Sequence, residues 1–119
     1  MVMHDSALVL AAAPVRTAIT HIATHTADPT VAGTSNLTSA ARVAVTWAAV
    51  DGDGDFSNSA AINFTGGAAS GACTWVSYWT ASSGGTCHGR KALTGDQTFN
   101  AAGEYSIPIA GLSISLTSS

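Results

Sequence analysis

The segment from Cys73 to Leu93 constrains the fold of this chain more than any other. It reads CTWVSYWTASSGGTCHGRKAL, two runs of aromatic, β-branched and other strand-compatible residues on either side of a small polar stretch with adjacent glycines. This is the pattern of a β-hairpin. Trp75 and Trp79 are four residues apart, so they point to one face of the first strand. Val76 and Tyr78 point to the other face, and large side chains on both faces predict a central strand in a layered structure.

Most of the remaining chain also predicts short strands. Turn-forming residues separate its apolar segments at intervals of about ten residues, which is typical of sandwiches and barrels. At 119 residues the chain is expected to form one domain. We therefore predict an all-β fold: a single antiparallel β-sandwich of jelly-roll or immunoglobulin-like type over residues 15–119. The other expected strands are Val15 to Ala27, Arg42 to Val50, Ala60 to Phe64, Thr98 to Asn100, Tyr105 to Ala110 and Leu112 to Leu116.

Residues 1–14 predict a short N-terminal helix or arm. The stretch from Ala7 to Ala13 is apolar, Asp5 or Ser6 can cap a helix, and Pro14 is expected to end it. A secretory leader would carry basic residues before its apolar stretch, whereas this segment carries Asp5. The helix is therefore the favoured interpretation.

The two cysteines are expected to be free thiols. A hairpin that turns at its glycines places Cys87 near Trp79 or Thr80, and Cys73 lies six or seven residues further along the first strand. That separation is roughly 20 Å at the usual rise of a strand. A disulfide requires Cα atoms within about 7 Å. Free thiols are typical of a protein assembled in a reducing cytoplasm.

The low charge of the chain excludes some classes of partner and favours others. Charged residues make up 9% of the chain, and the net charge is −3. Nucleic-acid binding requires clustered Lys and Arg, so we expect no nucleic-acid partner. No apolar run is long enough to span a membrane, and we expect no membrane partner. A surface of small neutral residues favours a protein that works inside an assembly.

The alternating aspartates Asp51, Asp53 and Asp55 form the most tempting ligand site. Carboxylates that converge from a glycine-rich loop can bind calcium. An EF-hand loop is excluded, because its glycine and glutamate positions are Phe56 and Ile62 here. Two interpretations stay open: a calcium site of another type, and a turn in which the aspartates accept hydrogen bonds from their own backbone.

Other residue types give little support for catalysis. His21 and His25 share one face of an expected strand but lie about 13 Å apart, too far to bind one zinc ion. No nucleophile elbow of the G-x-S-x-G type occurs. We therefore expect neither an enzyme nor a cofactor. The three tryptophans, Trp47, Trp75 and Trp79, could stack on sugars, although packing in a core is the alternative.

Several separated motifs, from Thr20 through most of the chain, form a recognisable set. They are His25 to Pro29, Arg42, Ala44 to Trp47, Trp79 to Ala81, Gly84 to Thr86, Gly89, Ala92 and Leu93. Together they resemble a family of small bacteriophage virion proteins, common in phages of actinobacteria, which are described as tail-fibre or minor structural proteins. Ala41 and Cys87 depart from the resemblance, since the family often has aromatic residues there.

The resemblance implies a structural β-sandwich subunit located in the virion and assembled in the host cytoplasm. We expect a capsid decoration protein that docks on the major capsid protein. The first alternative is a minor tail or tail-fibre protein in contact with other tail proteins and involved in host attachment, and the second is a carbohydrate-binding module. A homo-oligomer, such as a trimer, is expected for a virion subunit.

Docking is expected through the N-terminal segment, Met1 to Pro14, or through the loop from Val31 to Ser39. A short apolar arm that orders on binding is a common way to attach to a larger surface. Deletion of residues 1–14 is then expected to abolish incorporation into particles while the rest of the chain folds. The expected docking residues are Val2, Leu8, Leu10, Pro14, Val31 and Leu37.

Overall fold

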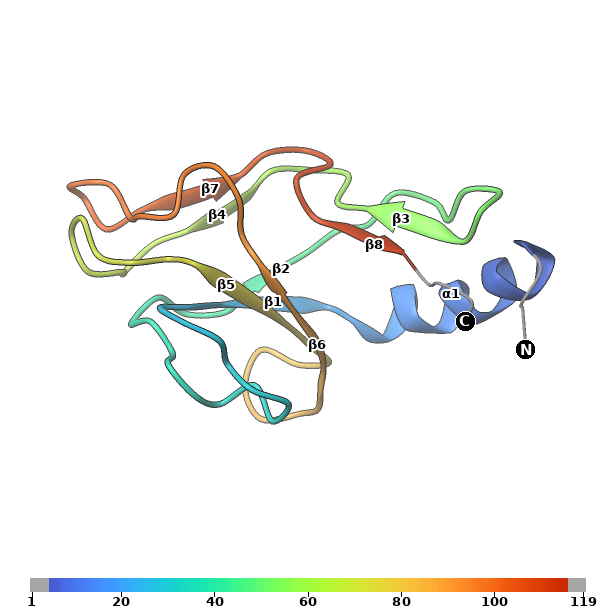
Figure 1. The fold of residues 1–119 in the computed structure, drawn as a ribbon, viewed down its shortest axis with the longest axis horizontal. Coiled ribbons are helices and arrows are strands. Elements are labelled where there is room, and N and C mark those ends of the chain that lie inside the picture. Colours follow the sequence, from blue (N-terminus) through green and yellow to red (C-terminus); the bar gives the residue numbers. More distant parts are fainter. Residues whose placement is uncertain (1–4, 116–119) are drawn as a thin grey trace.

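The structure, a computed structural model, describes residues 5–115 and contains one helix and eight short strands in this part of the chain (Figure 1). The elements are α1 (Asp5–Ala18), β1 (His21–His25), β2 (Val43–Ala44), β3 (Asp55–Ser57), β4 (Ile62–Phe64), β5 (Trp75–Trp79), β6 (Cys87–Ala92), β7 (Tyr105–Ile107) and β8 (Ser113–Ser115).

The largest sheet confirms the predicted hairpin. Its four antiparallel strands follow the order β2-β1-β5-β6, so β5 is an interior strand as expected. Trp79 is paired with Cys87, and a bulge between Tyr78 and Trp79 shifts the register of the hairpin there. Both cysteines are free, which confirms the prediction from the register.

The two faces of this sheet are covered in different ways. Ile22, Val76 and Tyr78 point to the main hydrophobic core. Two small antiparallel sheets, β3–β8 and β4–β7, contribute residues such as Phe56 and Phe64 to the same core. The opposite face, which carries Trp79, is covered by the loop that follows β1 (Figure 1).

The all-β prediction is confirmed in its coarse form, and the finer sandwich type is not. Antiparallel strands dominate and one short helix precedes them. The second layer is split into two separate two-stranded sheets, which are not joined into one. The described strands therefore do not form closed sheets, and the type of sandwich is not confirmed.

The helix does not end at Pro14, contrary to the prediction. It continues to Ala18, and the first strand begins at His21 instead of Val15. Proline inside a helix removes one backbone hydrogen bond and costs about 3 kcal/mol. Tertiary contacts offset this cost: Arg16 Nε donates to Ala48 O at 2.6 Å, and Arg16 Nη2 donates to Trp47 O at 2.6 Å.

Helix α1 is part of the main structure and does not form a separate arm. Ala12 is fully buried in the core, and Leu8 is 8% exposed. Leu8 lies against Gly54, where an added Cβ would approach the Leu8 backbone to 2.8 Å. Deletion of residues 1–14 would therefore remove core side chains, so it does not separate docking from folding.

Two strands differ from the predictions: one is shorter than expected, and one forms where the residue composition predicts a turn. The expected strand Arg42 to Val50 is reduced to the two residues of β2 and an isolated bridge between Trp47 and Asn58. Strand β3 was not expected, because it begins at Asp55 within the aspartate loop. The last expected strand includes Leu116, which lies outside the described residues.

Candidate functional site

The expected docking residues lie on two different elements. In α1, Leu10 is 76% exposed and Pro14 is exposed, whereas Leu8 is covered by the chain itself. In the loop after β1, Val31 and Leu37 are both exposed. Val2 lies outside the described residues. The structure therefore offers two separate apolar surfaces, and docking through either of them stays a prediction.

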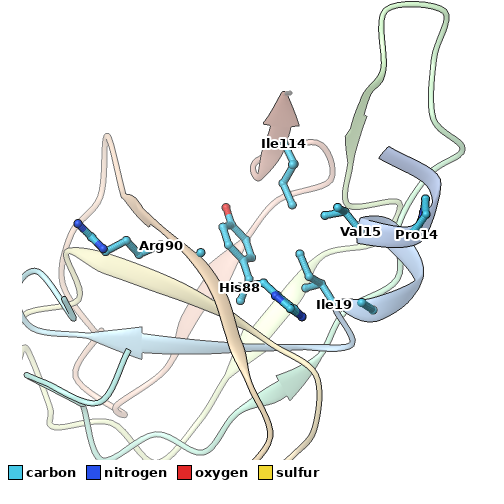
Figure 2. A pocket seen from close by; sticks show the side chains of 9 residues that line it. Pro14, Val15, Ile19, His88, Arg90 and Ile114 are labelled. Atoms are coloured by element: carbon cyan, nitrogen blue, oxygen red, sulfur yellow. The ribbon is translucent and has the colours of Figure 1, made fainter. Parts of the chain in front are cut away.

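An apolar groove of about 460 Å³ lies between α1, β6 and β8 (Figure 2). Pro14, Val15 and Ile19 form one side, and Ile114 projects from β8 toward it. The remaining lining residues are Ala18, Tyr78, His88, Gly89 and Arg90. No sequence pattern indicates this groove, since its lining residues come from four segments that are brought together only in the folded structure.

Tyr78 is the unusual member of the groove lining. Its side chain is 6% exposed, and its hydroxyl group has no hydrogen-bond partner within the described part of the chain. Burial raises the pKa of this phenol well above its usual value. The hydroxyl therefore stays protonated and can donate one hydrogen bond.

The structure does bring the three aspartates together. One carboxylate oxygen of each lies within 4.8 Å of the others. Asp51 Oδ1 already accepts hydrogen bonds from the backbone N–H groups of Asp53 at 2.8 Å and Asp55 at 3.0 Å. Ser115 Oγ donates to Asp55 Oδ1 at 2.7 Å. These bonds favour a self-capped turn that begins strand β3, while calcium binding stays untested.

We expect calcium to leave the stability of the protein unchanged. Asp51 already uses one carboxylate oxygen within the turn, which leaves fewer oxygens than the six to eight that calcium takes. The melting temperature measured in about 5 mM CaCl2, above the Kd of weak sites near 10⁻³ M, should equal that in EDTA. An increase that disappears in Asp51→Asn would instead establish a calcium site.

His21 and His25 are not brought together as metal ligands. His21 Nδ1 forms a hydrogen bond with Thr20 Oγ1 at 2.9 Å. His25 is fully buried and uses both ring nitrogens elsewhere: Nδ1 with Ser35 O at 2.9 Å and Nε2 with Ser77 Oγ at 2.7 Å. The two histidines therefore have separate partners.

The pair formed by Ser77 and His25 resembles a catalytic dyad in its distances but not in its access. Ser77 is fully buried, and its Oγ also accepts a hydrogen bond from Trp79 Nε1 at 2.6 Å. No described groove reaches this serine. Ser77, His25 and Trp79 therefore form a polar network inside the protein. The sequence did not reveal it, because 52 positions separate the two residues.

The tryptophans offer little surface for stacking on sugars. Trp47 is 8% exposed and packs in the core, and Trp79 is 4% exposed. The Arg42 guanidinium lies 3.7 Å above the Trp79 ring and covers it. Only Trp75 is partly exposed among the three. The sugar-stacking hypothesis is therefore wrong for Trp47 and Trp79.

Comparison with known families decides between the classes of protein that the sequence left open. Residues 6–115 match the family described as Podophage GP4 fiber I protein gp80. The chain belongs to this family. The match to the gp80 family extends from α1 to the end of β8 and therefore covers nearly the whole described fold. No curated protein matches the chain.

Membership of the gp80 family makes this chain a phage virion structural protein. The expected resemblance to virion proteins and the expected location in the virion are confirmed at that level. The family description names a fibre, which was the first alternative, and gives no support to capsid decoration. In its described part, the chain has no helix long and apolar enough to cross a membrane.

Proposed function

We propose that this protein is a structural component of a phage tail fibre. The observation that carries the proposal is the match to a fibre-protein family over residues 6–115. The role is one of assembly and not of catalysis. In support, the serine and histidine that lie at catalytic distance are sealed inside the molecule.

The shape of the molecule fits an element of a fibre. It measures 45 × 26 × 23 Å along its principal axes. Helix α1 and the end of β8 lie together at one end of the long axis, and the turn before β7 lies at the other (Figure 1). An elongated subunit of this kind can be attached at one end and present loops at the other.

The proposed partners are other fibre proteins of the same virion and further copies of this chain. The apolar surface of α1 is the proposed attachment site, because Leu10 is exposed there and charged residues are few on the helix. A homo-oligomer such as a trimer belongs to this proposal, since virion subunits assemble with symmetry.

Labelling intact particles tests the proposed location. Antibody-gold against this protein should mark the tail in electron micrographs, at a few copies per particle. Label distributed over the icosahedral shell would overturn the fibre proposal and restore capsid decoration. Absence of label from particles that contain all other virion proteins would overturn a virion role altogether.

A matched pair of substitutions tests the attachment surface. Leu10→Glu places a charge on exposed α1, and we expect it to reduce the amount of protein in purified particles at least about tenfold, because a buried unpaired charge costs several kcal/mol at an interface. Ile109→Glu is the control, since Ile109 is 65% exposed but lies between β7 and β8. Equal loss or equal retention of the two variants would contradict attachment through α1.

A further inference from the structure

The loop after β1 covers one face of the large sheet. We call residues 28–35 the cap loop. A Cβ on Gly33 would lie 2.5 Å from Cys87 Sγ and 2.9 Å from Trp79 Cζ2, so the loop backbone rests directly on these side chains. Pro29 is also fully buried. The cap loop therefore seals Trp79 from solvent.

Side chains of the sheet make polar contacts with the cap loop at both ends of the loop, at Asp28 and at Ser35. Arg90 Nε pairs with Asp28 Oδ1 at 3.1 Å, and both side chains are at least one third exposed. Exposed ion pairs of this kind contribute about 0–1 kcal/mol. His25 Nδ1 bonds to Ser35 O at 2.9 Å, and this histidine is fully buried. The buried contact is the one that a change in protonation can affect most.

The partners of His25 and Ser77 fix the direction of two hydrogen bonds in this contact. Ser35 O can only accept, so His25 Nδ1 carries a proton and donates it. Trp79 Nε1 can only donate, so Ser77 Oγ accepts from it. When His25 is neutral, Nε2 carries a lone pair and accepts the Ser77 hydroxyl proton. A neutral histidine therefore gives every donor of this contact an acceptor while the cap loop is closed.

A second proton on His25 is incompatible with this arrangement. A protonated Nε2 would donate to Ser77 Oγ instead of accepting from it. The Ser77 hydroxyl group would then lose its acceptor, and its proton would have to turn into a buried site. An unsatisfied buried donor and a buried charge both destabilise the closed form. We infer that His25 is an acid-sensitive latch whose protonation releases the cap loop from the sheet.

The surrounding charges do not compensate for a protonated His25. On this face and around the cap loop, the charged and titratable side chains are His21 of β1, Cys87 and Arg90 of β6, Asp28 of the cap loop, and Arg42, which directly precedes β2. Asp28, the carboxylate among them, is already paired with Arg90. Burial lowers the pKa of His25, the hydrogen bond from Nδ1 to Ser35 O opposes this, and the charge of Arg42 lowers it further.

The direction of the pH effect follows from linkage. With the loop open, His25 is exposed and titrates near pH 6.5. With the loop closed its pKa is lower, so the open form binds more protons below pH 6.5 and gains population as the pH falls. If the closed form takes up no proton at all, the open population rises about 30-fold between pH 8 and pH 5.

Hydrogen exchange measured by NMR tests this inference on the intact protein. The reporters are the Trp79 indole N–H and the Gly33 amide, and the reference amides are those of Val76 and Tyr78 in β5. After correction for intrinsic rates, we expect the reporters to lose protection several-fold to about 30-fold from pH 8 to pH 5, while the reference amides change less than twofold.

Substitutions assign the effect to one histidine. His25→Asn keeps a donor for Ser35 O but cannot titrate, so its reporters should show no dependence on pH. The triple variant His4→Asn/His21→Asn/His88→Asn leaves His25 as the one histidine of the chain. It should keep the wild-type dependence, and it decides the assignment even if His25→Asn fails to fold. Constant protection of the reporters in the wild type, an equal loss of protection at the reference amides of β5, or a flat pH profile in the triple variant would each overturn the latch.

Discussion

We expect Asn58→Ala to destabilise the protein by about 3–5 kcal/mol, because it leaves buried backbone groups without partners. Asn58 is 1% exposed, and its side chain connects three segments. Its Nδ2 donates to Ala60 O and Pro108 O, both at 2.9 Å, and its Oδ1 accepts from the Leu112 N–H at 2.9 Å. Alanine removes all three bonds, and the loss should appear as a lower midpoint of urea unfolding followed by tryptophan fluorescence.

Asn63→Ala is the matched control for this substitution. Asn63 lies on neighbouring β4, is exposed, and accepts one hydrogen bond from Ser106 Oγ at 2.7 Å. Removal of an exposed contact should change the free energy of unfolding by less than about 0.5 kcal/mol. If the two variants lose similar stability, Asn58 is not the tie between β3, β4 and the turn before β8.

We expect Trp47→Ala to destabilise the protein by about 4–5 kcal/mol. The Trp47 ring packs edge-on against Phe56, with the ring centroids 5.1 Å apart, and the centroid of the Tyr78 ring lies 6.3 Å away. Its Nε1 donates to Ile19 O at 2.9 Å, which ties the end of the helix segment to the core. Alanine leaves a cavity and an unpaired carbonyl, and circular dichroism during urea unfolding measures the loss.

Two further variants separate the causes of this effect. Trp47→Phe keeps an aromatic ring and removes the donor to Ile19 O, so it should lose about 1–3 kcal/mol. Trp75→Ala removes a partly exposed tryptophan from β5 and should lose less than Trp47→Ala. If Trp75→Ala is the more damaging of the two, Trp47 is not the centre of the aromatic packing.

Parts of the fold that depend on local pattern could be predicted from the sequence. The alternation around Trp75 and Tyr78 identified the hairpin, its faces and its interior position, because side chains in a strand alternate between two faces. The same register separated the two cysteines. For the candidate site, spacing alone brought the three aspartates together, since a short turn places alternate residues near one another.

Other parts depend on contacts between distant segments, which no local pattern contains. The helix passes Pro14 because Arg16 bonds to carbonyl groups of residues 47 and 48. Strand β3 forms out of the aspartate turn because β8 pairs with it. The groove beside Tyr78 likewise exists only where α1, β6 and β8 meet.

Residue type and spacing within short segments are enough to establish the strand-rich class of this protein, its central hairpin and its resemblance to virion proteins. Contacts between distant segments account for the two separate small sheets of the second layer and for the loop that seals Trp79. The same contacts place His25 between Ser35 O, 2.9 Å from Nδ1, and Ser77 Oγ, 2.7 Å from Nε2. These features depend on which distant backbone and side-chain groups satisfy one another after the chain has folded.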